Sequence, residues 1–183
     1  MSSSSNSSVP DSIRRRINLG ALALLAWPFA GWATGGSSDG PLPGLRRWGR
    51  GEFRRFGFLV YEASLWAADD PQRPPLALRL DYKRRIASSA IAEASVKEMR
   101  RFGVEETVLA AWHERMARIF PDVQDGDHIL GVYTLDGVRF SHNGRDLGGV
   151  DDARFARDFF GIWLDPRTSA PELRAALLTP QAG

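Results

Sequence analysis

The chain has 183 residues, 43% of them hydrophobic, so it is long enough for one domain with a sizeable core. It contains no cysteine, which excludes disulfides, a thiol nucleophile and cysteine-ligated metals. Its 24 basic residues are nearly balanced by 22 acidic ones, and the arginine pairs are interleaved with acids. Because nucleic-acid binding needs a basic stripe, this pattern predicts no nucleic-acid partner.

The N-terminal segment has the layout of a targeting signal. Three arginines at 14–16 precede an apolar run, and small residues end at Ala33. This order predicts a signal peptide over 1–33 and a periplasmic or secreted protein without a stable membrane span after cleavage. The arginines leave the general and the twin-arginine export routes open, and an uncleaved anchor is the alternative. Cleavage would remove three arginines and one aspartate, leaving 21 basic and 21 acidic residues.

Two expected strands follow the signal. Residues 34–44 are rich in glycine, serine and proline and predict a flexible linker to a domain over 45–180. The stretch Gly51–Ala68 is apolar at odd and even positions alike, which favours a strand buried on both faces in the middle of a sheet. Gly57 marks either a bulge or a break between two shorter strands. Residues 76–85 alternate between apolar and polar, so they predict a strand with one wet face that pairs antiparallel with the first.

The rest of the chain alternates between helical and strand patterns. Apolar residues at helical spacing predict two helices, a meander of three short strands with Asp-Gly and Asn-Gly turns, and two more helices. The expected helices are 88–102, 105–120, 152–164 and 171–178, and the expected strands are 128–135, 138–142 and 145–150. The expected capping residues are Ser88 or Ser89, Asp151 or Asp152, and the capping box of Ser169 and Glu172. This order predicts an α+β fold whose antiparallel sheet carries its helices on one side.

Sequence motifs for metal or nucleotide chemistry are missing. The histidines, at 113, 128 and 142, are not spaced as metal ligands, and no phosphate loop, dinucleotide fingerprint or nucleophile elbow occurs. The acids of the PDVQDGD loop lack the full calcium-binding pattern and indicate a solvated turn. We therefore expect no metal and no cofactor.

Aromatic residues crowd the first expected sheet, among them Tyr61, Trp66 and Tyr82. They either fill a large core or line an apolar cleft between the sheet and the helices. In the second interpretation, Tyr61 and an arginine from the preceding segment, Arg50 or Arg47, form the polar end of the cleft. A guanidinium fork and a phenol hydroxyl together suit a carboxylate, provided that the chain bends at a neighbouring glycine.

A series of segments resembles the chalcone isomerase-like family, and its exported bacterial branch most of all. The segments are FGFLVYEASLW, LALRLDYKRRI, SVKEMRRFG, FPDVQDGD, SHNGRDLG and FFGIWLDPRTSAPELRAALL. They span roughly residues 45–178, nearly the whole expected domain. The resemblance implies an open-faced β-sandwich, in which a large antiparallel sheet is covered by a layer of helices with a ligand cleft between them.

The family has an enzymatic and a fatty-acid-binding branch, and the resemblance implies different site residues for each. The polar positions of the ring-closing enzymes fall on Tyr61 and near Ala87, Ala94 and Gly161, so most of the catalytic hydrogen-bond donors are missing here. In the binding branch an arginine and a tyrosine hold the fatty-acid carboxylate, and Arg50 or, second, Arg47 would pair with Tyr61.

We therefore predict an exported, non-catalytic protein that binds a small apolar ligand such as a fatty acid. The expected ligand-binding residues are Arg50, Tyr61, Tyr82 and Trp66. Two alternatives remain. One is an isomerase acting on a chalcone-like or other unsaturated ketone, with Tyr61 as the acid and an arginine as the electrophile. The other is a scaffold or interaction protein whose cleft is filled by its own side chains.

Overall fold

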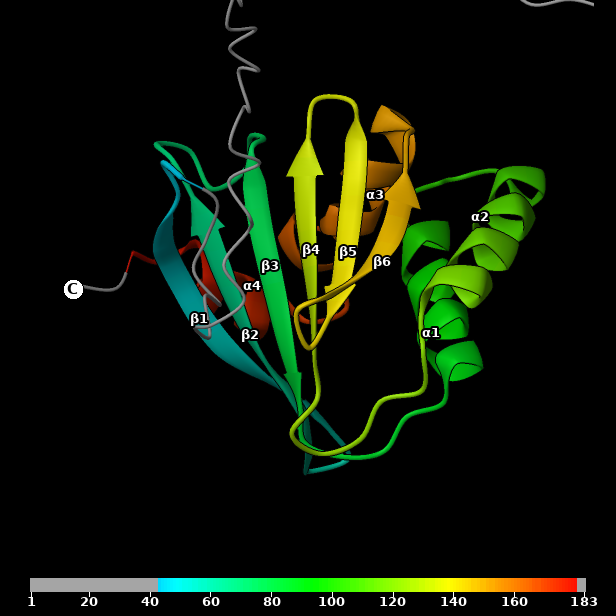
Figure 1. Ribbon diagram of the computed structural model, residues 1–183. Helices are drawn as coiled ribbons and strands as arrows, with labels where there is room; N and C mark the ends of the chain where they lie inside the picture. Colours follow the sequence, from blue (N-terminus) through cyan, green and yellow to red (C-terminus); the bar gives the residue numbers. More distant parts are fainter. Residues whose placement is uncertain (1–42, 181–183) are drawn as a thin grey trace, which may run out of the picture. The chain divides into compact units, whose positions relative to one another are not determined.

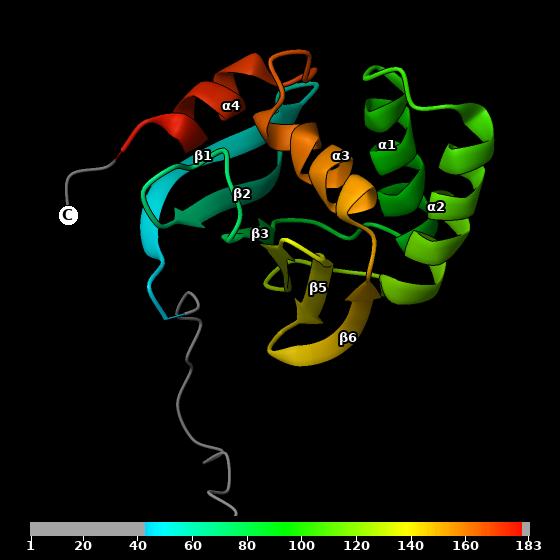
Figure 2. The ribbon, with the colours of Figure 1, turned by 90° about the horizontal axis from the view of Figure 1, so that it is seen from above.

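Six strands form one antiparallel sheet in strict chain order, and four helices accompany it (Figure 1). The computed structural model describes residues 43–180. The strands are β1 (Arg46–Arg55), β2 (Phe58–Ala67), β3 (Leu76–Tyr82), β4 (His128–Thr134), β5 (Gly137–His142) and β6 (Arg145–Val150). The helices are α1 (Ser88–Arg100), α2 (Glu106–Ile119), α3 (Ala153–Leu164) and α4 (Pro171–Leu178). The predicted α+β class and the helices on one side of the sheet are confirmed (Figure 2).

The stretch expected to be one central strand is a hairpin at the edge of the sheet. β1 and β2 pair antiparallel and are joined by a two-residue turn at Phe56 and Gly57, whose φ angles are 51° and 82°. Of the two expectations at Gly57, the break between shorter strands is therefore correct. The central-strand prediction was wrong because the apolar character of the stretch comes from two adjacent strands, and Phe56 and Phe58 lie exposed at their junction.

The other strands lie close to the predicted ranges. β2 and β3 pair antiparallel, as expected, and this pairing puts Tyr61 opposite Tyr82. The helices α1 and α2 connect β3 to β4 along the chain, and β4, β5 and β6 form the predicted meander. The expected wet face of β3 is drier than predicted, since Ala77 is 1% exposed and Arg79 only partly exposed.

The expected helix caps are only partly confirmed. Asp152 caps α3 by accepting from the backbone N–H groups of Arg154 and Phe155. By contrast, Ala87 and Ala170 are the N-caps of α1 and α4, and neither makes a side-chain cap. The expected serine caps are therefore not formed. Asp122 accepts from the backbone N–H of Ser88, and the Ser169 hydroxyl donates to Glu98.

Two contacts position the helices over the sheet. The inward face of α3 carries large buried aromatics, including Phe155, Phe159 and Phe160, and packs on β4 and β5. α4 lies close against β1, because Gly49 has no side chain where the α4 backbone passes.

No helix within residues 43–180 is both long and apolar enough to cross a membrane.

Candidate functional site

A polar group lies between the inner face of the sheet and α3. The Trp163 indole N–H of α3 donates to the Tyr61 hydroxyl of β2 at 3.1 Å. The Tyr61 ring stacks on Phe53 of β1, with ring centroids 5.0 Å apart, and meets the Tyr82 ring of β3 edge to face at 6.0 Å. Three strands and one helix therefore hold the two phenols in a fixed geometry.

Both phenols stay protonated and neutral over the whole physiological pH range, because the pKa of each is raised. Burial raises the pKa of Tyr61 well above its ordinary value, against a smaller lowering by the Trp163 hydrogen bond. Burial also raises the pKa of Tyr82, and the neighbouring Tyr61 adds to the shift. Within residues 43–180 neither hydroxyl donates a hydrogen bond, so both hydrogens are available to an acceptor.

The expected pairing of an arginine with Tyr61 is not formed. Arg50 pairs with Ser64, whereas Phe53 pairs with Tyr61. Because side chains alternate faces along a strand, Arg50 lies on the face of the sheet opposite to Tyr61. Trp66 lies on this opposite face as well, so of the four expected ligand-binding residues the structure brings together only Tyr61 and Tyr82.

The second candidate arginine is no closer to the phenols. Arg47 pairs with Trp66 and is exposed. The bend that would carry an arginine inward does not occur, because the inner positions of β1 at Gly49 and Gly51 are covered by α4. A carboxylate beside Tyr61 would therefore be held by neutral donors and not by a guanidinium.

The interior beside this polar group is closely packed. A cavity of about 20 Å³ lies between β3, β4, β5 and α3, which is room for about one water molecule. Its lining is apolar throughout: Leu78, Leu80, Ile129, Gly131, Phe140, Phe159, Phe160 and Trp163. The space between the sheet and the helices, where the cleft is expected, is therefore filled by aromatic side chains in this structure.

The positions that match the polar residues of the ring-closing enzymes carry little chemistry here. Ala87, just before α1, and Ala94, within α1, are exposed, and Gly161 faces the Phe102 ring. Apart from Tyr61, these positions supply no side-chain donor that would stabilise a phenolate or an enolate. In the described part of the chain no three His, Asp or Glu side chains are grouped to hold a metal ion.

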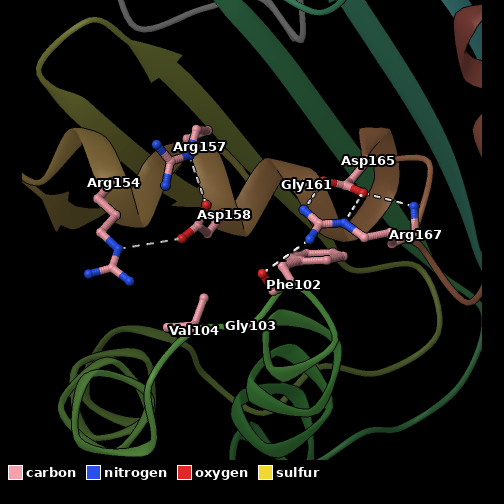
Figure 3. Close-up of a pocket in the computed structure, with 9 residues that line it drawn as sticks. All are labelled: Phe102, Gly103, Val104, Arg154, Arg157, Asp158, Gly161, Asp165 and Arg167. Atoms are coloured by element: carbon pink, nitrogen blue, oxygen red, sulfur yellow. Dashed lines mark hydrogen bonds and ion pairs between the residues drawn. The ribbon is translucent and has the colours of Figure 1, made fainter.

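An open pocket of about 300 Å³ lies outside this region, between α3 and the end of α1 (Figure 3). The sequence does not predict this pocket, because its arginines are spread over one face of α3 and the segment that follows. Each of them already has an acid partner: Arg154 contacts Glu105, Arg157 contacts Asp158, and Arg167 contacts Asp165. The positive charges of the pocket are thus largely neutralised. In the sequence, the repeat of arginine and aspartate at helical spacing on α3 was the only pattern that could have indicated this pocket.

The sheet order and the single layer of helices define an open-faced α+β sandwich. The family model described as chalcone isomerase-like matches residues 49–179, and the chain belongs to this family. An uncharacterised protein of Haemophilus influenzae is 27% identical over 156 residues, which cover 84% of this chain and 71% of that protein.

The same fold occurs in a plant protein of known structure. The crystal structure of a fatty-acid binding protein of Arabidopsis thaliana matches with a TM-score of 0.58 and 13% identity. The match covers 75% of this chain and 88% of the plant protein. At this identity the likeness establishes the fold.

Proposed function

We propose that this chain is a non-catalytic binding protein for a small apolar ligand with an acidic head, such as a fatty acid. The observation that carries the proposal is the pair of phenols that meet edge to face between the sheet and α3 and that donate no hydrogen bond to another protein group within residues 43–180. A carboxylate supplies acceptors for both hydroxyls, and the apolar lining between the sheet and α3 suits an aliphatic chain. The fold shared with a fatty-acid binding protein supports the same choice.

Ligand entry requires α3 to move. A cavity of about 20 Å³ is far below the several hundred Å³ of ordinary ligand pockets. Phe159, Phe160 and Trp163 line it from α3, so their outward displacement would open the space. This displacement would also break the hydrogen bond from Trp163 to Tyr61 and free the Tyr61 hydroxyl for the ligand.

The test is lipid extraction of the natively purified protein with mass spectrometry, followed by calorimetric titration with palmitate. We expect a stoichiometric fatty acid or saturable palmitate binding. The double variant Tyr61→Phe/Tyr82→Phe should bind at least about tenfold more weakly, because it loses both donors. Tyr133→Phe is the matched control, since it removes the third tyrosine hydroxyl of the chain from β4. The absence of any binding, or equal binding by the double variant, would reject the proposal.

A filled scaffold is the second candidate, and the small volume of the interior cavity favours it. In that case the aromatic side chains of α3 are the permanent occupant of the cleft. The purified protein would then carry no lipid, and palmitate would leave its thermal unfolding midpoint unchanged. A rise of the midpoint with palmitate concentration would instead support the binding protein.

We further propose that the protein is exported and acts outside the cytoplasm. The proposal rests on the layout of residues 1–33, which lie outside the residues that the structure describes. N-terminal sequencing of the protein from a periplasmic fraction tests it. The expected first residue is Thr34, and an intact N-terminus in the cytoplasmic fraction would contradict it.

A further inference from the structure

The tip of the β1–β2 hairpin presents two aromatic side chains to solvent. Phe56 is 87% exposed and Phe58 is 65% exposed. They are joined by Gly57 at the end of the hairpin, and in Figure 1 this end of the sheet points away from the β4–β5 turn. Large exposed apolar side chains that stand next to each other mark contact with another molecule more often than isolated ones do.

The backbone of this turn makes the choice of phenylalanine unexpected. Phe56 has a φ of 51° and Gly57 a φ of 82°. The β5–β6 turn has almost the same angles, 50° and 79°, but there the residues are Asn143 and Gly144. Asparagine tolerates this left-handed region, whereas a bulky aromatic residue is strained in it. Asparagine at position 56 would therefore cost less backbone strain than phenylalanine. An exposed phenylalanine in a strained conformation indicates a role other than stabilising the fold.

Two arginines lie on the exposed rings. The Arg55 guanidinium is 5.4 Å from the Phe56 ring centroid, and the Arg84 guanidinium is 5.6 Å from the Phe58 ring centroid. Within residues 43–180 neither arginine forms an ion pair with an acid. Both charges are therefore free to meet an anionic partner at the same place as the rings.

Two other cations near the tip are already paired with acids. Arg54 forms an ion pair with Glu52 at 2.7 Å, and Lys83 forms one with Glu62 at 2.9 Å. The two ring-stacked arginines, by contrast, remain available to a partner. The tip therefore carries two exposed apolar rings with a positively charged guanidinium beside each.

We propose that the β1–β2 tip docks on the surface of a lipid membrane that carries anionic headgroups. Phe56 and Phe58 would enter the boundary between headgroups and acyl chains, while Arg55 and Arg84 would contact phosphates. A protein partner fits less well, because a specific interface buries roughly 800 Å² on each side and this tip is a two-residue turn with its flanks. The proposal stands on the hairpin alone and does not depend on a ligand in the interior.

The first test compares co-sedimentation of the full chain with vesicles of phosphatidylcholine alone or mixed with phosphatidylglycerol. The wild type should bind the mixed vesicles more strongly, and added salt should weaken the binding. Phe56→Asn/Phe58→Thr should reduce the partition coefficient at least about tenfold. Arg84→Gln should reduce it about fivefold. Leu135→Thr is the matched control, since Leu135 is 78% exposed at the opposite end of the sheet.

Two further measurements localise the contact. Because the chain has no cysteine, Phe56→Cys and Leu135→Cys each accept one environment-sensitive fluorophore. We expect a blue shift and quenching by brominated lipids for the label at position 56 and neither for the label at 135. This readout separates the tip from any attachment by the apolar N-terminal segment. Phe56→Asn alone should leave the unfolding midpoint equal or raise it, which shows that lost binding is not lost folding.

Three outcomes would overturn the proposal. The first is a label at position 56 that stays in water on bound vesicles. The second is vesicle binding by Phe56→Asn/Phe58→Thr that equals the wild type. The third is self-association of the wild type, lost in this double variant, without any vesicle binding, which would assign the tip to a second copy of the chain.

Discussion

Trp163 and Tyr61 are 102 positions apart in the chain and are joined by a hydrogen bond of 3.1 Å from the indole N–H to the phenol oxygen. The bond connects α3, the helix that covers the inner face of the sheet, to Tyr61 on β2. Any opening of the sandwich between these two elements must first break this bond.

Tyr61→Phe should destabilise the fold by about 1–2 kcal/mol, because it leaves the buried Trp163 N–H without an acceptor. Trp163→Phe removes the other partner, and the double variant should show a coupling of about 1 kcal/mol in a mutant cycle. The measurement is urea unfolding followed by circular dichroism. Tyr133→Phe is the control, with an expected change within about 0.5 kcal/mol. Additive losses in the cycle would show that the bond contributes nothing.

Gly49→Ala should be strongly destabilising. A Cβ at this position would lie 2.3 Å from the Leu177 carbonyl oxygen, and the α4 backbone cannot yield as a flexible side chain would. We expect a loss of about 1–3 kcal/mol as α4 is pushed off β1. The neighbouring Arg50→Ala lies on the exposed face and should change the stability by less than about 0.5 kcal/mol. Equal urea midpoints for the two variants would contradict this close approach of α4.

Asp152→Ala should lower the stability by about 1 kcal/mol, because two backbone N–H groups of α3 lose their acceptor. Glu172→Ala provides the comparison at α4, where the expected capping box is not formed. Its effect should stay within about 0.5 kcal/mol. Thermal unfolding of the two variants measures the difference. A larger loss for Glu172→Ala than for Asp152→Ala would reverse the assignment of caps.

The element types were predictable because their signals are local. Alternation, helical spacing and the Asn-Gly turn lie within a few residues, and they gave β4 to β6 and all four helices to within a few positions. Asp152 was predictable for the same reason, since a cap acts on the next two or three residues. The start of α1 was not, because Asp122, which accepts from the backbone N–H of Ser88, comes from a distant part of the chain, and α4 has no side-chain cap.

The candidate site was predictable only in part. Tyr61 and Tyr82 were chosen as aromatic neighbours in one sheet, and their pairing across β2 and β3 confirms that they share a face. A pairing of Arg50 with Tyr61 requires a bend in the chain, whereas the register of the β1–β2 hairpin puts Arg50 on the other face of the sheet. Strand register depends on the turn, and Gly57 alone predicts a bulge or a break but not the two-residue turn that sets this register.

The loop expected to be a solvated turn contains a structural carboxylate. Asp127 accepts from the Asn143 side-chain amide at 2.8 Å and from the backbone N–H of Gln124 at 2.9 Å. The Asn143 hydrogen bond is the main reason that the pKa of Asp127 lies below its ordinary value of 3.8, with a further contribution from the Gln124 bond. His142 adds a contact at 3.5 Å. The carboxylate thus joins the α2–β4 loop to the β5–β6 turn.

A depressed carboxyl pKa predicts a definite pH dependence. The folded state binds the Asp127 proton less readily than the unfolded state, so the stabilisation is complete above about pH 4 to 5 and is lost as the pH falls further. Asp127→Ala should therefore lose about 1–3 kcal/mol at pH 7, and its deficit against the wild type should shrink towards pH 3. Asp125→Ala, in the same loop and exposed, is the control and should show no such convergence. Urea titrations at pH 7, 5 and 3 measure the effect, and a deficit that stays constant with pH would show that the charge of Asp127 is not what stabilises the turn.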